Sequence, residues 1–195
     1  MASVDDVAAA IISEHPGLDQ MQLHKLLYFV QAASLVWQDT PAFDVEIEAW
    51  TWGPVTRVIA GRYMQFDKRP IRDPVAGDSK HLDSELRQTI KKVVERYGDL
   101  SGPTLAKLTK APESPWRQVR RGLPDDAWSD REIPRSLIRR YHRQHGVLGT
   151  RLTPTEKRLA QRYLENRDTE ALADLFEEAT GARPQISSEL KRASK

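Results

Sequence analysis

The chain has 195 residues, of which 39% are hydrophobic and 30% are charged, and its formal net charge is only +2 at pH 7. These values are typical of a soluble globular protein with one main domain and a small addition. The chain contains no cysteine, which excludes disulfide bonds, thiolate zinc sites and cysteine nucleophiles. The longest apolar stretch, residues 26–37, is too short to cross a bilayer, and no leader of basic and then apolar residues opens the chain. We therefore expect a cytoplasmic protein that does not enter a membrane.

The charge is distributed unevenly along the chain. Residues 110–162 hold 13 Lys and Arg against 6 Asp and Glu, whereas residues 165–178 hold 6 acidic residues against Arg167 alone. A basic middle and an acidic late segment suit a charged partner. Solvated helix faces carry many charges as well, and we favour this simpler interpretation.

The first two elements are expected to be helices. Residues 4–14 place apolar side chains at helical spacing, with Ser3 as the N-cap. A second helix over residues 19–38 begins at Asp19, with Gln22 three residues later as in a capping box. Its apolar residues cover nearly all sides, which indicates a helix buried in the middle of the domain.

A short β element is expected next. Apolar residues alternate with Glu46 and Glu48, which predicts a half-buried strand near residues 45–52. Gly53 closes this strand, and Pro54 is expected as the first residue of the next helix. The inner face of that helix is predicted to consist of Val55, Val58, Ile59 and Tyr63.

Further helical segments are predicted before residue 147. They cover residues 84–97, a shorter stretch from Pro103, a single turn after Ser114, and a helix from Pro134 to Gly146. The fold class that follows is mainly α. We expect a compact helical domain, residues 1–146, around the buried central helix at about 19–38, with the small β element beside it.

The last part of the chain is expected to form an extension. Residues 153–156 form a capping box with proline at the first helical position, and a second capped helix starts at Asp168. Two such short helices bury little surface on their own. We therefore predict a C-terminal helical hairpin over residues 147–181, packed on the main domain or on another chain, and a flexible polar tail over residues 182–195.

The histidines do not point to a metal site. His142 and His145 lie one helical turn apart, but Arg139, Arg140 and Arg143 surround them. The positive charge of these arginines opposes a bound cation. We therefore expect no metal here.

One pair of carboxylates raises the question of catalysis. Glu46 and Glu48 project from one face of the expected strand, and paired carboxylates are one arrangement for acid–base chemistry. We favour the interpretation that both lie on the wet face of a half-buried strand. No glycine-rich phosphate loop, Gly-x-Ser-x-Gly or His-Glu-x-x-His motif occurs. We expect no enzyme and no cofactor, and an enzyme that acts through the two glutamates is the alternative.

The basic stretch suggests a second alternative. It contains two groups of arginines, one after Trp116 and one on a single helical face: Arg117, Arg120 and Arg121, and Arg135, Arg139 and Arg143. Such groups suit phosphates, but acidic residues lie close by and no clear helix-turn-helix is present. A nucleic-acid-binding protein, such as a transcriptional regulator of its own operon, is therefore an alternative that we do not favour.

Several segments, taken in order, resemble a known domain family. They are Leu23–Ala32, Phe43–Asp44, Ile47–Trp50, Gly53–Val55, Tyr97–Gly98, Leu105, Leu108–Thr109 and Ser114–Trp116. This ordered set, over residues 20–120, resembles the Panacea domain of SocA-like antitoxins, which is also found in phage-associated proteins. Lys110 is a departure, because the family pattern leads us to expect histidine after the threonine.

The resemblance implies a mostly helical protein with a small β element and with no established catalytic residues or cofactor. It implies an antitoxin of a type II toxin–antitoxin system, which binds a protein toxin encoded by an adjacent gene and blocks it. One member of the family also delivers its toxin to a cellular protease, so a proteolytic adaptor is a further alternative. The identity of the toxin does not follow from the resemblance.

Two surfaces are candidates for partner binding, because exposed aromatic and arginine side chains dominate the energetics of interfaces. The first candidate combines residues from the end of the strand, the central helix and the turn after Ser114: Trp50, Trp52, Gly53, Pro54, Tyr28, Trp116, Arg117 and Arg120. Within it, we expect Trp52 to be partly exposed and Trp50 and Trp116 to lie more in the core. The second candidate is the C-terminal hairpin, with Tyr163, Leu172 and Phe176.

Overall fold

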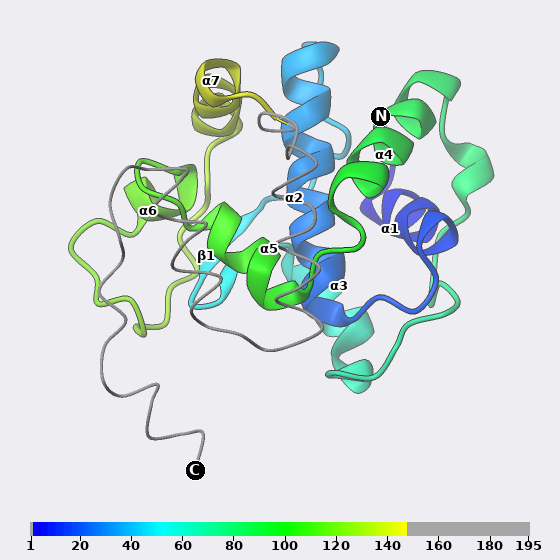
Figure 1. The fold of residues 1–195 in the computed structure, drawn as a ribbon, viewed down its shortest axis with the longest axis horizontal. Coiled ribbons are helices and arrows are strands. Elements are labelled where there is room, and N and C mark those ends of the chain that lie inside the picture. The colour runs from blue at the N-terminus through cyan, green and yellow to red at the C-terminus, as the bar shows by residue number, and fades with distance from the viewer. Residues whose placement is uncertain (1, 148–195) are drawn as a thin grey trace, which may run out of the picture. The chain divides into compact units, whose positions relative to one another are not determined.

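The computed structural model describes residues 2–147, and the C-terminal hairpin and tail expected beyond them lie outside the described residues. The described part is mainly helical, with one two-stranded antiparallel sheet (Figure 1). Two short 3-10 turns, Met64–Phe66 and Ser79–His81, join α3 to α4. The helices and strands are α1 Val4–Glu14, α2 Gln20–Trp37, β1 Glu48–Trp50, β2 Gly53–Val55, α3 Arg57–Tyr63, α4 Ser84–Tyr97, α5 Gly102–Thr109, α6 Pro115–Val119 and α7 Arg135–His145.

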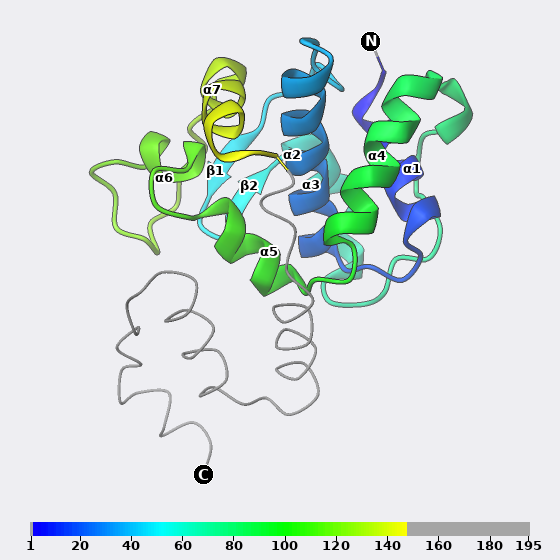
Figure 2. The ribbon, with the colours of Figure 1, turned by 45° about the horizontal axis from the view of Figure 1, so that its top comes forward.

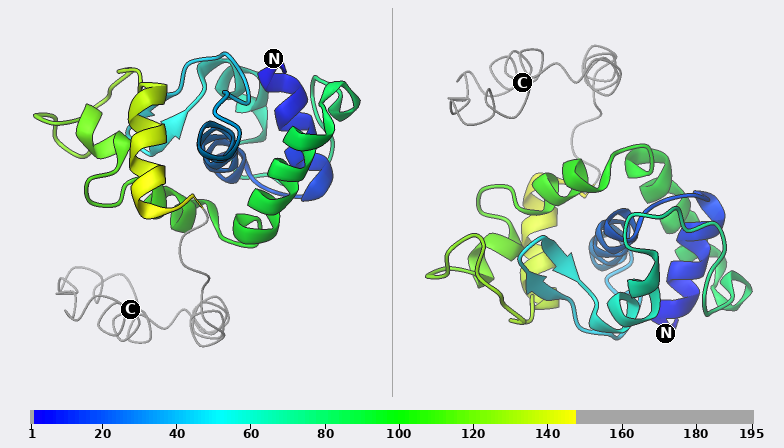
Figure 3. Two further views of the ribbon diagram at one scale, coloured as in Figure 1. Left: turned by 90° about the horizontal axis from the view of Figure 1, so that it is seen from above. Right: turned by 90° about the horizontal axis from the view of Figure 1, so that it is seen from below.

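The helix α2 is the centre of the domain, as its apolar sequence predicted. Figure 3 shows α2 end-on, with α1 and α4 on one side of it and the two strands and α7 on the other. All thirteen residues from Leu23 to Leu35 are buried. The aromatic ring of Phe29 stacks on that of Tyr97 in α4 at 4.2 Å between centroids. A helix covered on every side fixes the positions of the elements around it.

The expected helix caps are confirmed. Asp19 accepts a hydrogen bond from the backbone N–H of Gln22 (2.7 Å), and the Gln22 side chain accepts one from the backbone N–H of Asp19 (2.8 Å). Ser3 caps α1 by accepting from the N–H of Asp6 (3.0 Å). These local bonds satisfy N–H groups that have no partner inside the helix, which is why the helices begin where the sequence places them.

The β element differs from the prediction. Gly53 and Pro54 lie in β2, where they pair with Trp50 and Ala49 of β1, and they do not begin a helix. The helix α3 starts only at Arg57. Proline is tolerated here because β2 is an edge strand of the sheet. The result is a tight β-hairpin whose turn consists of Thr51 and Trp52 alone.

A third segment supports this hairpin from the other side. Residues 131–133 run beside β1, because Ala49 N–H donates to the carbonyl of Arg131 (2.8 Å) and Ile133 N–H donates to that of Ile47 (2.7 Å). Figure 2 shows the two strands beside α2, next to α5 and α6. The hairpin therefore joins residues far apart in the sequence.

Two expectations about the inner face of α3 were wrong. Val55 lies in β2 and not in the helix, and 41% of Val58 is exposed. Ile59 and Tyr63 do face the core as predicted. The seven-residue helix therefore buries a narrower stripe of side chains than the sequence suggests. No helix among residues 2–147 is both long and apolar enough to span a membrane.

Candidate partner-binding surface

Exposed tryptophan side chains lie on the hairpin and on a loop beside it. Trp52, in the two-residue turn, is 68% exposed, and Trp128, in the loop before residues 131–133, is 60% exposed. Trp50 is half-buried, and its ring lies 4.9 Å from that of Trp128. We call Trp50, Trp52 and Trp128 the tryptophan surface. Large exposed rings cost free energy in water, so such a group at the surface of a domain marks a candidate binding surface.

Three hydrogen bonds hold the hairpin from different directions. The indole N–H of the buried Trp116 donates to the carbonyl of Trp50 (2.7 Å). The hydroxyl of Thr51 donates to the carbonyl of Ala127 (3.1 Å), and Lys25 Nζ donates to the carbonyl of Pro54 (3.0 Å). The tip is thus anchored to α6, to the loop before Trp128 and to α2, so its tryptophan is presented on a rigid support.

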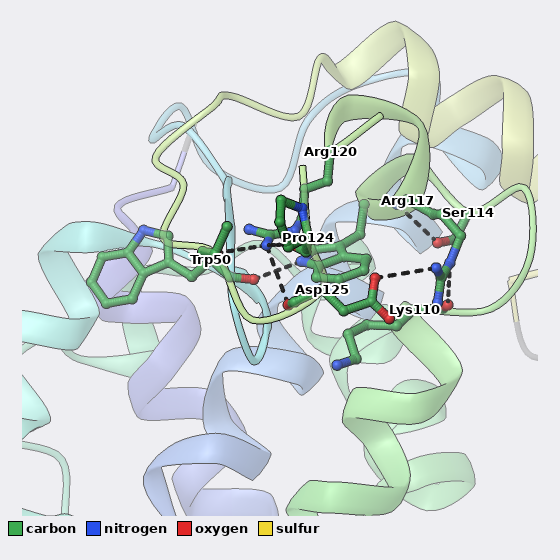
Figure 4. Close-up of polar contacts among 9 residues, drawn as sticks. Trp50, Lys110, Ser114, Arg117, Arg120, Pro124 and Asp125 are labelled. Carbon is green, nitrogen blue, oxygen red and sulfur yellow. Dashed lines mark hydrogen bonds and ion pairs between the residues drawn. The ribbon is translucent and has the colours of Figure 1, made fainter. Parts of the chain in front are cut away.

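Arg120 binds the neighbouring loop to the hairpin. Its buried guanidinium donates to the carbonyls of Ala49 (3.0 Å), Pro124 (3.0 Å), Asp125 (3.3 Å) and Ala127 (2.6 Å). Figure 4 shows this guanidinium between the hairpin and the loop. Its partners are backbone oxygens, so Arg120 organises the loop that carries Trp128.

Glu48 is not on a wet face, contrary to the prediction. Glu46 is exposed, but Glu48 is buried and forms a two-pronged ion pair with Arg57 (2.9 and 2.8 Å). It also accepts from the indole N–H of Trp50 (2.6 Å). The Arg57 guanidinium lies 5.7 Å from the centre of the Trp50 ring. Glu48 therefore positions Trp50 and Arg57, and it does not form a carboxylate pair with Glu46.

Further cations lie against the aromatic rings. Lys110 Nζ lies 5.9 Å from the centre of the Trp52 ring and 5.0 Å from that of Trp116. Arg120 and Arg117 lie 4.8 Å and 5.8 Å from the Trp116 ring. Such cation–π contacts stabilise both groups, the more so where water is excluded.

Beneath the hairpin lies a buried lysine. Lys25 is 1% exposed, and burial, aided by the charge of Lys110, lowers its pKa to about 7. Gly53 packs directly on it, because a Cβ on Gly53 would lie 2.8 Å from Lys25 Cε. The neighbouring His24 is also buried, and desolvation lowers its pKa to about 3. Both groups therefore favour their neutral forms more than free side chains do.

One comparison with known proteins identifies a family. Residues 23–117 match the family model described as antitoxin SocA-like, Panacea domain. This part of the chain is a SocA-like Panacea domain. No curated protein and no solved structure matches the chain. The match confirms the resemblance seen in the sequence, and it supports an antitoxin role in general terms. It includes the hairpin, Lys110 and Trp116, and it ends before Trp128.

The Panacea domain keeps several of the expected partner-binding residues inside. Tyr28 is 2% exposed and its hydroxyl lies 3.0 Å from Nε2 of the buried His142, so it belongs to the core. The expected site residues at the surface are Trp52, part of Trp50, and Arg117. Tyr163, Leu172 and Phe176 lie outside the described residues. The buried members of the set are Tyr28, Gly53, Pro54, Trp116 and Arg120.

Sequence reasoning missed Trp128 and Lys110. Trp128 stands in a polar loop with no apolar periodicity around it, and an isolated tryptophan in such a loop was the available signal. Lys110 was noted only as a departure from the family pattern. Its place beside two tryptophan rings depends on the contact between α5 and the hairpin, which no local pattern reveals.

Three of the four arginines of α7 form ion pairs within the described residues. Arg135 pairs with Asp44 (2.6 Å), and Arg139 and Arg143 both pair with Asp39. The helical face that the sequence offered to phosphates is thus occupied by the loop after α2. Among residues 2–147, no group of three potential metal-binding side chains occurs, and His142 points at Tyr28.

Proposed function

We propose that this chain is the antitoxin of a type II toxin–antitoxin system, and that it neutralises a co-encoded protein toxin by binding it directly through the tryptophan surface. The observation that carries the proposal is the exposed Trp52 on a hairpin anchored from three sides, within a SocA-like Panacea domain. The two proteins would meet in the cytoplasm.

The rigid support and the exposure of Trp52 favour this hairpin as a binding surface. A tryptophan that is already held in place loses little conformational entropy when a partner covers it, so most of its burial energy contributes to affinity. Trp50 and Trp128, whose rings lie 4.9 Å apart, add apolar area on the same hairpin and the loop beside it, and Arg57 at the Trp50 ring and Lys110 at the Trp52 ring add charged groups. An apolar centre with a polar rim is the usual anatomy of a protein interface.

The proposal assigns no catalytic step to the chain. The carboxylate pair considered from the sequence is separated, because Glu48 is paired with Arg57 and hydrogen-bonded to Trp50 while Glu46 faces solvent. A general acid or base needs access to a reacting group. Masking the toxin requires only a complementary surface.

A growth assay tests this function. The gene next to this one is expressed alone and together with the full chain, and growth is followed. We expect toxicity alone and rescue by the wild-type chain. Trp52→Ala should lose the rescue at equal protein level, because it removes the centre of the surface without touching the core.

Trp37→Ala is the matched control. Trp37 is also an exposed tryptophan (42%), but it lies twelve residues after Lys25 on α2, about 18 Å along the helix axis from the hairpin support. It should rescue growth like the wild type. A neighbouring gene that is harmless alone, or rescue that Trp52→Ala leaves intact, would contradict the proposal.

A further inference from the structure

Three cationic side chains under and beside the hairpin make no direct ion pair within residues 2–147. Lys25 donates to the carbonyl of Pro54, Arg120 donates to backbone carbonyls, and Lys110 lies against the rings of Trp52 and Trp116. The nearby Glu48 and Asp125 are paired with Arg57 and Arg117.

These cationic groups lie close enough to affect one another's pKa in a partly water-free place. Desolvation is the main cause that lowers the pKa of Lys110; the charge of Asp125 raises it in part, and the charges of Arg117 and Arg120 lower it. The charge of Lys110 in turn adds to the burial that lowers the pKa of Lys25. Positive charge concentrated where the dielectric constant is low attracts an anion more strongly than the same charge in open water.

An apolar contact lies directly beside this charge. Lys110 is half-buried, and the ring of Trp52 next to it is 68% exposed. A partner that covers Trp52 therefore comes close to Lys110, and it must either supply a negative group or leave the ammonium unpaired in the interface. An unpaired charge in an interface opposes binding, whereas a paired one fixes the register of the partner.

We propose that the Trp52–Lys110 corner receives a polypeptide segment of the toxin in which an Asp or Glu carboxylate stands beside an apolar side chain. The carboxylate pairs with the Lys110 ammonium, and the apolar side chain covers the Trp52 ring. This inference rests on the proposed function and adds the chemistry of the partner at one position.

The charges favour a polypeptide over a nucleic acid. A nucleic-acid backbone is bound by a row of free cations that follow its phosphates. Here four of the arginines that could form such a row are paired: Arg117 with Asp125, Arg135 with Asp44, and Arg139 and Arg143 with Asp39. Lys110, against the exposed Trp52 ring, makes no direct ion pair within residues 2–147, and one such cation suits a single carboxylate.

The test measures binding of the full-length chain to the purified product of the adjacent gene by biolayer interferometry. Lys110→Glu should weaken binding by at least about tenfold, because it places like charges together. Lys110→Gln should weaken it less, and its milder change protects the test against misfolding. Lys91→Glu makes the same charge change on the exposed face of α4, on the other side of α2, and should bind like the wild type.

A charge exchange then identifies the contact. Surface Asp and Glu residues of the adjacent-gene product are changed to Lys one at a time, and one of them should restore binding to Lys110→Glu. If the wild-type chain fails to bind that product at all, the proposed function fails. If the wild type binds but Lys110→Glu and Lys91→Glu bind equally well, or no exchange restores affinity, this inference fails while the proposed function stands.

A fluorescein-labelled oligothymidine is the second probe. We expect no saturable binding to the wild-type chain. Saturable binding that Trp52→Ala and Lys110→Glu both abolish would indicate that a single-stranded nucleic acid occupies this corner. That result would overturn the proposal that a polypeptide segment binds there.

Discussion

Gly53 in the hairpin lies directly against Lys25 of the central helix, so closely that a methyl group on the glycine would come within 2.8 Å of Lys25 Cε and 3.0 Å of its Nζ. The backbone of Gly53 also has φ of +107°, which side-chain-bearing residues rarely adopt. The lysine amine in turn bonds the carbonyl of the next residue, Pro54. The tryptophan hairpin is therefore seated on α2 through a contact that only glycine permits.

The first prediction concerns this contact. Gly53→Ala should lower the free energy of unfolding by about 2 kcal/mol or more, because it adds both backbone strain and a clash. Urea denaturation measures the change. Gly61→Ala is the control, since Gly61 lies in α3 with nothing within 4 Å of a new Cβ, and it should be neutral or stabilising by up to about 1 kcal/mol. Equal effects of the two substitutions would contradict the described packing.

Lys25 leads to a prediction about pH. Its pKa is about 7 in the folded protein and 10.5 when unperturbed, so between these values the unfolded state binds one more proton. The wild type should therefore gain stability as pH rises from 7 to 10.5, by up to about 1.4 kcal/mol per pH unit. The groups that face Lys25 electrostatically are Lys110, Asp19 and His24.

Lys25→Met removes this proton linkage. Unfolding of both proteins is measured across the same pH range, and the stability of the wild type relative to the variant should rise with pH. Loss of the bond to Pro54 costs the variant about 1 kcal/mol at every pH, so it shifts the difference without changing its slope. Parallel stability curves for the two proteins would show that Lys25 is not buried as described.

His142 gives a prediction at the acidic end. Its burial lowers its pKa from 6.5 to about 4, so the unfolded state binds the extra proton in this window and stability should fall as pH falls through it. His142→Gln keeps a polar group beside Tyr28 but does not titrate, and it should make the fall shallower. His24, whose pKa is about 3, keeps part of the slope. His145→Gln, on the exposed side of α7, is the control, and a slope that changes equally in both variants would contradict the prediction.

The glutamates of the β element form a fourth test. Glu48→Gln should lower stability by about 1–3 kcal/mol, because it leaves Arg57 without its two-pronged partner and weakens the bond to Trp50. Glu46→Gln, at an exposed position two residues earlier, should change it by less than about 0.5 kcal/mol. Thermal unfolding compares the two. A loss of stability of the same size in both variants would contradict the described burial and pairing of Glu48.

The helices could be predicted because their signals are local. The capping box of Asp19 and Gln22, the N-cap of Ser3, the apolar stripe from Leu86 to Tyr97 and the turn after Ser114 all appear in the structure as expected. Each depends on residues within one or two helical turns. The all-round apolar pattern of α2 also indicated its central place, since such a helix has no face to offer to water.

The hairpin could not be predicted because its determinants are distant. Gly53 and Pro54 looked like the end of a strand and the start of a helix, but β2 depends on pairing with β1 and on Lys25 of α2. The burial of Glu48 depends on Arg57, and the support of Trp50 depends on Trp116, 66 residues later. The candidate site was therefore located in part, with Trp52 recognised and Trp128 missed.

The affinity of the purified chain for the product of the adjacent gene, measured by isothermal titration calorimetry, tests the central claim most directly. We predict that the wild type binds and that Trp52→Ala, folded and equally stable, binds at least about 30-fold more weakly. A wild-type chain that gives no binding, or a Trp52→Ala variant with unchanged affinity, would contradict the proposal that this hairpin binds a protein toxin.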